Sequence, residues 1–184
     1  MLTVGTKTEV AMRIADTIEA FINGNGWDDE IERNEETGRS RVSTNFIISN
    51  QLFELCVEGD ENGELLVLFL SAPFRVIEGK YVDACMYFNY INDCFNFSGR
   101  ISVSENGWIS YREPLMTDGI ELDGRMIDNM LASGIMLFER HFDAIASIAM
   151  TRKTYEAIRE EYFKKNDPGT ALPEGTDCGI ENEA

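Results

Sequence analysis

The sequence predicts an α+β fold, in which an antiparallel sheet of five to six strands is flanked by helices. Two Asn-Gly dipeptides, Asn62-Gly63 and Asn106-Gly107, each separate two strand-like segments, and this arrangement is a strong signal for a β-hairpin. Apolar residues recur at three- and four-residue spacing before, between and after these hairpins, which indicates helices. The expected order of elements is α-β-β-β(-β)-α-β-β-α.

The first helix is predicted to run to about Asn23, with Thr6 or Thr8 as its N-cap. The glycines that follow favour a helix end, because glycine readily adopts the left-handed conformation common there. Residues 27–33 then alternate with period two, which predicts a weak strand. We expect this strand at the edge of the sheet, because three acidic side chains aligned on one side of it discourage further pairing. The apolar face of the helix comprises Val10, Ala11, Ile14, Ile18, Phe21 and Ile22.

Three more strands are predicted before the next helix. Residues 40–48 are rich in β-branched side chains, and residues 53–58 alternate between apolar and other side chains. Residues 65–70 follow the first Asn-Gly turn and are apolar at every position. A strand that is apolar on both faces is expected to be central and covered on both sides. Pro73 is expected to close this strand region, and the second hairpin takes in residues 101–113.

Residues 78–97 form the most apolar helix of the chain, with two apolar stripes and a seam of asparagines beside Asp93. A helix that is apolar around most of its circumference must be buried on more than one side. The sheet can cover one side, and a second helix or a second subunit has to cover the other. One stripe comprises Tyr81, Ala84, Cys85, Phe88, Ile91 and Phe95, and the other comprises Tyr87, Tyr90, Cys94 and Phe97.

Helical periodicity returns at Asp123 and continues to about residue 149, and Thr154 is the predicted N-cap of a last short helix over residues 155–163. The apolar stripe of the long helix comprises Ile127, Met130, Leu131, Gly134, Phe138, Phe142, Ile145 and Ala149. Residues 166–184 contain several prolines and glycines and carry five acids and no base, which predicts a disordered acidic tail. Residues 1–165 are accordingly expected to form a single α+β domain.

Charge and hydropathy argue against several classes of partner. The chain has 184 residues, with 16 Lys and Arg against 33 Asp and Glu, which gives a formal net charge of −17. Binding to nucleic acid or to an anionic membrane surface needs clustered basic residues. The longest strongly apolar run is the six residues 65–70, whereas a membrane-spanning helix needs about 20. We therefore expect neither nucleic-acid nor membrane partners.

The cysteines and the start of the chain indicate a cytoplasmic protein. Cys85 and Cys94 fall on one predicted helix, which separates them by about 13 Å. A disulfide needs Cα atoms within about 7 Å of each other, so these two thiols should not pair. The first residues lack the basic and apolar regions of a signal peptide. Free thiols in a reducing cytosol are the simplest interpretation, and it extends to Cys56 and Cys178.

No motif specifies a reaction. Glu58–Gly63 resembles the start of a calcium-binding loop, but the twelfth position is Phe69 where a glutamate is required, so a hairpin turn explains the segment better. The single histidine, His141, is expected to be a partly exposed helix residue, and no cysteine or histidine spacing matches a metal site. The acidic cluster within residues 28–36 is typical of a solvated face. We predict no catalytic residue, no metal and no cofactor.

Four segments, residues 64–76, 81–93, 99–115 and 126–158, resemble in pattern and order the YbjN-like family of bacterial sensory transduction regulators. This resemblance implies a type III secretion chaperone-like fold, an antiparallel sheet with helices on it, often as a dimer. It supplies no catalytic residues. Family members often show Tyr-Pro where this chain has His141-Phe142, so a continuous last long helix is expected here, with a break near Thr151.

The sequence leaves two functions open. The first is a non-enzymatic protein-binding module in the cytosol, chaperone-like or regulatory, that works as a homodimer with a protein partner. Its expected contact surface is the aromatic cluster Tyr87, Tyr90, Cys94 and Phe97, since interface cores favour aromatic side chains. The same cluster could instead pack under the last helix within one subunit.

The second function is a small-molecule or ion-sensing regulatory domain. It requires a concave pocket with convergent polar groups. Asn89, Asn92 and Asn96 lie along one predicted helix and are the candidates for these groups.

Overall fold

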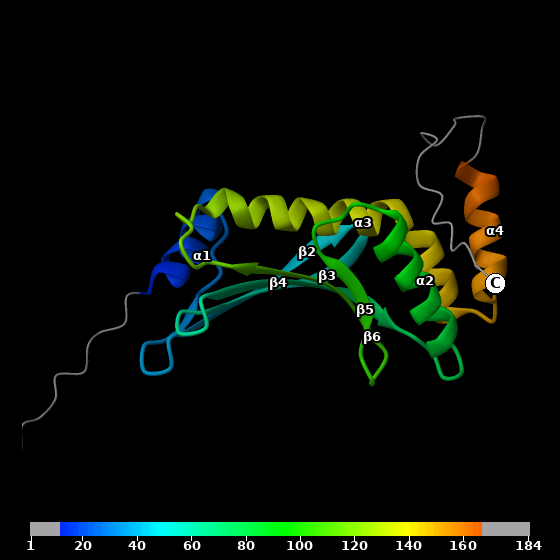
Figure 1. Cartoon of the computed structure of the whole chain (residues 1–184), viewed down its shortest axis with the longest axis horizontal. Helices are drawn as coiled ribbons and strands as arrows, with labels where there is room; N and C mark the ends of the chain where they lie inside the picture. The colour runs from blue at the N-terminus through cyan, green and yellow to red at the C-terminus, as the bar shows by residue number, and fades with distance from the viewer. Residues whose placement is uncertain (1–11, 167–184) are drawn as a thin grey trace, which may run out of the picture.

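The computed structural model describes residues 12–166 as four helices and a curved six-stranded sheet (Figure 1). The elements are α1 (Arg13–Gly24), β1 (Glu32–Asn34), β2 (Arg39–Ile48), β3 (Gln51–Asp60), β4 (Leu65–Arg75), α2 (Tyr81–Cys94), β5 (Arg100–Val103), β6 (Trp108–Met116), α3 (Gly124–Met150) and α4 (Tyr155–Asn166). The predicted fold class and the order of elements are confirmed.

The strand order is β1-β2-β3-β4-β6-β5, and every neighbouring pair is antiparallel. The two Asn-Gly turns connect β3 to β4 and β5 to β6, as predicted. The strand at residues 65–70 is central, because β4 lies between β3 and β6. The edge position expected for the first strand is also confirmed, since β1 pairs with β2 alone.

The helices lie along one face of the sheet, with α1 and α3 running over it and α2 and α4 gathered at one end (Figure 1). Leu66, Leu68 and Leu70 point from β4 into this layer and are fully buried. The prediction that this strand is covered on both faces is wrong, because no described helix covers the other face. Leu65 and Phe69 on that face are only half-buried, and Val67 is buried between the adjacent strand residues Glu58 and Pro114.

Two further expectations about the strands need correction. The segment at residues 27–33 forms a strand only from Glu32, and Trp27 packs instead against the rings of Phe21 and Phe46. The half-buried indole lies between α1 and β2, and residues 27–31 form no strand. Pro73 does not end β4, because the strand continues to Arg75 through an irregular register that accommodates the missing N–H.

The second side of α2 is covered by helices of the same chain. Ala84, Tyr87, Phe88 and Ile91 are buried, and α2 contacts β5, α3 and α4. The helix is shorter than the predicted 78–97. Cys85, which was assigned to a buried stripe, is exposed, because α2 packs on the end of the sheet and turns this position outward.

A polar clamp fixes the start of α4 against α2. Lys80 Nζ lies 2.6 Å from Asp83 Oδ2, and the Tyr155 backbone N–H donates to Asp83 Oδ1 across 2.8 Å. Lys80 also donates to the Lys153 carbonyl. The Lys80 ammonium holds the pKa of Asp83 below its usual range. Asp83 therefore caps a helix from another element, since the first N–H groups of a helix lack partners within it.

The long helix behaves as expected from the sequence. Asp123 caps α3 by accepting a hydrogen bond from the Arg125 N–H, and the helix continues without a break through His141-Phe142 to Met150. Thr154 accepts from the Ala157 N–H across 3.3 Å at the start of α4. The predicted Thr6 or Thr8 cap, Cys178 and all but the first residue of the predicted acidic tail lie outside the described residues.

Candidate binding face of the sheet

The face of the sheet that points away from the helices, here called the open face, has no covering layer in the described part of the chain. Side chains at alternate strand positions form it, so it is set by the period of two along each strand. Its members are Glu32, Asn34, Arg39, Arg41, Ser43, Asn45, Ile47, Leu52, Glu54, Cys56, Glu58, Asp60, Leu65, Val67, Phe69, Ser71, Arg75, Arg100, Ser102, Trp108, Ser110, Arg112, Pro114 and Met116.

Apolar side chains form a patch toward one end of the open face, at the start of β4 and the end of β6. This patch, here called the apolar strip, comprises Leu65, Val67, Phe69, Pro114 and Met116. They come from the two neighbouring strands β4 and β6, and the register places Leu65 opposite Met116 and Val67 opposite Pro114. Met116 is exposed and Phe69 is half-buried. Apolar area is therefore presented to solvent on the side of the sheet that no described helix covers.

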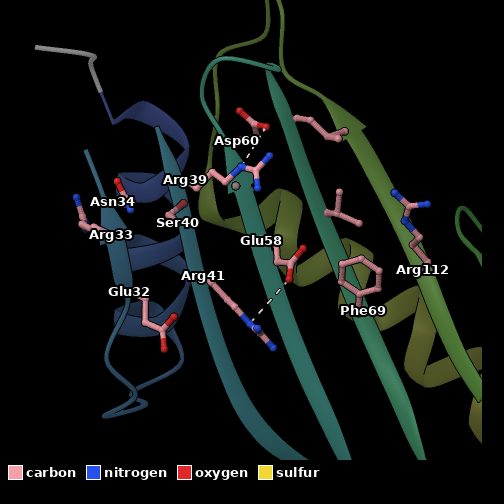
Figure 2. A pocket seen from close by; sticks show the side chains of 13 residues that line it. Glu32, Arg33, Asn34, Arg39, Ser40, Arg41, Glu58, Asp60, Phe69 and Arg112 are labelled. Atoms are coloured by element: carbon pink, nitrogen blue, oxygen red, sulfur yellow. Dashed lines mark ion pairs between the residues drawn. The ribbon is translucent and has the colours of Figure 1, made fainter. Parts of the chain in front are cut away.

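Two arginines flank the apolar strip on the β2 side. Arg39 Nε lies 3.7 Å from Asp60 Oδ2, and Arg41 Nε lies 3.8 Å from Glu58 Oε1. Figure 2 shows both pairs reaching across from β2 to β3 over the open face. All four side chains retain contact with solvent, and exposed pairs of this kind contribute only about 0–1 kcal/mol. Both arginines are thus only weakly paired, and N–H donors of their guanidinium groups remain available.

Two more arginines flank the strip on the other side, and they lie opposite each other. Arg100 on β5 is the direct cross-strand partner of Arg112 on β6. The Arg112 guanidinium carbon lies 5.6 Å from the centre of the Phe69 ring, and Arg100 Nη1 donates to the carbonyls of Phe97 and Gly99. Within residues 12–166 neither arginine forms an ion pair with an acid.

A shallow basin of about 610 Å³ lies on this part of the open face (Figure 2). Its lining includes Arg39, Arg41 and Arg112 together with Val67 and Phe69. Arg33 also borders it, but its guanidinium is committed to Asp16 and Glu19 of α1, at 2.8 and 2.6 Å. The acids Glu32, Glu58 and Asp60 line it as well, so the basin combines apolar side chains with charged groups of both signs.

A second exposed apolar group lies at the other end of the open face. Ile47 is 70% exposed and Leu52, its cross-strand partner, is 56% exposed. Trp108 is the strand partner of Arg75, whose guanidinium carbon lies 3.6 Å from the indole centre. The open face thus offers apolar contact at both ends, and a row of polar side chains across the sheet lies between them.

The sequence did not identify any of these residues as a site. The signal that could have found them is the mismatch between residues 65–70, apolar throughout, and the neighbouring strands, in which arginine and glutamate alternate with apolar side chains. A neighbour with one polar face indicates that the same face of the central strand meets solvent.

The predicted interface residues lie on α2 and in the segment after it, at one end of the sheet, and none of them is on the open face. Tyr87 is fully buried, Tyr90 and Phe97 are half-buried and Cys94 is exposed. Tyr87 Oη lies 3.4 Å from His141 Nδ1, and the rings of Tyr87 and Tyr90 lie 6.1 Å apart. Burial raises the pKa of Tyr87 and raises that of Tyr90 to about 12. Tyr90, Cys94 and Phe97 therefore remain at least partly exposed to solvent, and Tyr87 belongs to the core.

His141 is buried, with 1% of its surface exposed, so the expectation of a partly exposed helix residue is wrong. The rings of Phe95, Phe97 and Tyr162 surround it, with the Phe95 ring centre at 4.6 Å and the Tyr162 ring centre at 5.2 Å. Burial lowers the pKa of His141 to about 4. Its Nε2 atom has no hydrogen-bond partner among the described residues. His141 is buried through tertiary packing, because α2 and α4 cover this position of α3.

The asparagines proposed for a ligand pocket are not brought together around a cavity. The Asn92 side chain accepts from the Ile101 N–H and donates to the Ile101 carbonyl, both at 2.9 Å, which joins α2 to β5. Asn89 and Asn96 are exposed. None of the three lines the basin on the open face or a second cavity of about 390 Å³ between α3 and α4.

The structure also addresses the thiols, metal ligands and membrane spans of the described residues. Cys85 and Cys94 are not bonded to each other, and Cys56 is a buried free thiol whose pKa is raised by burial. No group of three or more potential metal-ligating side chains occurs between residues 12 and 166. No helix among these residues has both the length and the hydropathy to cross a bilayer.

No model of a known protein family matches this chain, and no curated protein matches its sequence. Three solved structures are similar to it in fold. The HopA1–SchA chaperone–effector complex has a TM-score of 0.48 at 14% identity, over 70% of this chain and 91% of that chain. The ExsC–ExsE complex has a TM-score of 0.48 at 12% identity, over 72% of this chain and 96% of that chain. The Yersinia pestis type III secretion chaperone SycH, in complex with a fragment of YscM2, has a TM-score of 0.44 at 17% identity, over 73% and 98% of the two chains. These likenesses are distant, and no function is transferred from them.

Proposed function

We propose that this chain is a non-enzymatic protein-binding module of the cytosol, chaperone-like or regulatory, which holds a segment of a partner protein on the open face of its sheet. The observation that carries the proposal is the apolar strip on a sheet face that no described helix covers. This function agrees with the family that the sequence resembles, the YbjN-like regulators.

The open face has the composition of an interface. It carries the apolar strip toward one end, with arginines on both sides of the strip and acids of β3 beside it, and an exposed tryptophan at the other end. Fully buried interface cores are enriched in aromatic residues, methionine and arginine. Contiguous exposed apolar patches on soluble proteins commonly mark binding sites. A partner seated here would remove Phe69, Met116 and their neighbours from water, at a gain of about 25 cal/mol per Å² of apolar surface.

We also propose a homodimer in which the outer face of α2 meets a second copy. Val82 is 73% exposed, and Cys85 and Met86 extend its exposed surface along the helix. Cys94 and the outer parts of Tyr90 and Phe97 continue the same region toward the end of α2. Tyr87 supports this surface from within the core. A dimer formed through α2 would leave both open faces available for a partner.

A small-molecule sensor is the alternative, and one observation favours it. The basin of about 610 Å³ falls within the volume range of small-ligand sites, and its guanidinium groups suit an anionic compound. The basin is shallow, however, and its apolar floor continues outside it to Met116. A segment of protein can cover this continuous surface better than a compact ligand can.

The test is capture from the native cell lysate with matched variants, followed by quantitative mass spectrometry. Phe69→Glu places a charge in the apolar strip, and Met136→Glu places the same charge on the exposed outer side of α3. Phe69→Glu should lose at least one protein that both the wild type and Met136→Glu retain. Equal capture by all three chains would contradict the proposal. Circular dichroism and thermal unfolding would show that both variants are folded.

A further inference from the structure

The arginines of the open face are unevenly placed with respect to the charge of the whole chain. The open face carries five arginines and four acids, while the chain as a whole carries a net charge of −17. Four of the arginines flank the apolar strip: Arg39, Arg41, Arg100 and Arg112. The strands place no lysine on this face. Arginine presents a planar group with several donors, which suits a carboxylate better than the point charge of lysine does.

The pair of Arg100 and Arg112 is the most informative feature. Residues directly opposite on antiparallel strands have Cβ atoms about 5 Å apart, and like charges placed there destabilise the sheet. No acid among the described residues compensates them, and their open-face neighbours toward the hairpin turn are Ser102 and Ser110. Arg100 Nη1 donates to the carbonyls of Phe97 and Gly99. A carboxylate bound by the other donors of Arg100 together with those of Arg112 would reduce the repulsion and accept charge-assisted hydrogen bonds from both.

The arginines on the β2 side can act in the same way. Each is paired to an acid of β3 through a single long contact, at 3.7 Å for Arg39 and 3.8 Å for Arg41. An incoming carboxylate would therefore not have to break a buried or bidentate pair. Between the two arginine pairs lie the apolar strip and, on β3, the acids Glu58 and Asp60 that pair with Arg41 and Arg39. The strip needs apolar side chains as its occupant.

We infer that the occupant of the open face is an acidic, amphipathic segment of a partner protein, with carboxylates at its two margins and apolar side chains between them. The inference rests on the proposed function and specifies the chemical character of the partner segment. The arginine pair at Arg100 and Arg112 anchors one margin, and Arg39 with Arg41 holds the other. A basic segment would be repelled by Arg100 and Arg112, whereas the acids on the open face and on the rest of the chain would attract it without a defined site.

The test is selection from a random 16-residue peptide library on the intact chain, followed by binding of individual peptides by fluorescence anisotropy. The selected pool should be enriched in Asp and Glu flanking apolar positions. Replacing the acids of a selected peptide by their amides should weaken binding at least tenfold, and raising the salt concentration should weaken it too. Enrichment of basic peptides, or no enrichment, would overturn the inference.

Matched variants locate the binding and separate the two proposals. The double variant Arg100→Glu, Arg112→Glu should bind the selected acidic peptide at least tenfold more weakly. Arg152→Glu, an exposed position between α3 and α4, should not change the affinity beyond about twofold. If apolar peptides without acids are selected and Phe69→Glu abolishes their binding, the acidic chemistry is wrong and the proposed function survives. If Phe69→Glu leaves peptide binding unchanged, both are wrong.

The acidic C-terminal residues of this chain are a competing occupant, and one further variant excludes them. Converting Asp167, Glu174, Asp177, Glu181 and Glu183 to their amides removes all five acids of that segment. The affinity of the selected peptide should stay the same. An increase of fivefold or more would mean that this segment occupies the open face, and it would overturn the assignment to a partner protein.

Discussion

His141 shows how a single side chain can reverse an expectation drawn from the sequence. It lies in a stretch with Arg140 before it and Phe142 after it, which is typical of a helix at the boundary of the core. In the folded chain it is enclosed by aromatic rings of α2, α4 and the segment after α2, and its Nε2 atom has no described partner. Such an environment disfavours the charged imidazolium.

This burial predicts a pH dependence of stability that His141→Phe should remove. The pKa of His141 is about 4 in the folded chain, against about 6.5 when unfolded. Between these values the unfolded chain binds a proton that the folded chain does not, so the free energy of unfolding falls as the pH falls from about 6.5 to about 4. The loss amounts to about 3 kcal/mol. Below about pH 4 this contribution changes no further.

Urea unfolding of the wild type and of His141→Phe at pH 7.0, 5.5 and 4.5 measures this effect. The charged and titratable groups facing the imidazole are Tyr87 of α2, Tyr162 of α4 and Arg140 of α3, and all three are the same in the wild type and in His141→Phe. The difference between the two chains should therefore grow in favour of the variant as the pH falls. Parallel pH profiles would contradict the assignment of a neutral, buried His141.

At the scale of elements, the position of α3 over the sheet depends on one close approach. A Cβ added at Gly134 would lie 2.8 Å from Tyr111 Cδ1 and 3.3 Å from Leu70 Cδ2. The Tyr111 ring cannot easily move, because its hydroxyl accepts from the Gly99 N–H and also bonds to Glu113. The absence of a side chain at Gly134 thus lets the long helix lie directly on β4 and β6.

Gly134→Ala should therefore destabilise the chain by about 1–3 kcal/mol, the usual cost of forcing extra volume into a packed core. Gly24→Ala is the matched control, because a Cβ at the end of α1 would meet nothing within 4 Å. It should leave stability unchanged or raise it by less than about 1 kcal/mol, as alanine is the better helix former. Equal thermal unfolding of the two variants would show that α3 does not depend on this contact.

The elements themselves could be predicted from the sequence to a large extent, and the layers less so. Both Asn-Gly hairpins, the central position of β4 and the unbroken α3 follow from local pattern, because turn chemistry and periodicity act over a few residues. Coverage does not. Whether Phe69 faces a helix or solvent depends on how many helices the chain can place on each side, and the burial of Tyr87 and His141 depends on where α4 docks. The candidate site therefore could not be predicted from the sequence.

At the scale of the whole molecule, the structure separates two surfaces with different expected occupants. The outer face of α2 carries exposed Val82, Cys85 and Met86, and the open face lies on the sheet. A second copy on α2 and a partner protein on the open face can be present together.

The homodimer makes a prediction of its own. Sedimentation velocity at micromolar concentration should show a dimer for the wild type and a monomer for Val82→Glu, because a charge at this exposed apolar position would be buried without a partner in the dimer. Phe69→Glu should remain dimeric. A wild-type monomer would contradict the dimer, and an unchanged Val82→Glu would contradict its placement on α2.

The protein-binding role of the open face is tested most directly by site-specific photo-cross-linking in the native cell. A photoreactive phenylalanine analogue would replace Phe69 in one chain and the exposed Met136 of α3 in another. The account predicts that position 69 cross-links to a segment of another protein that is rich in Asp and Glu, and that position 136 does not. Cross-linking at position 69 only to a second copy of this chain, or no cross-link beyond that found at position 136, would contradict it.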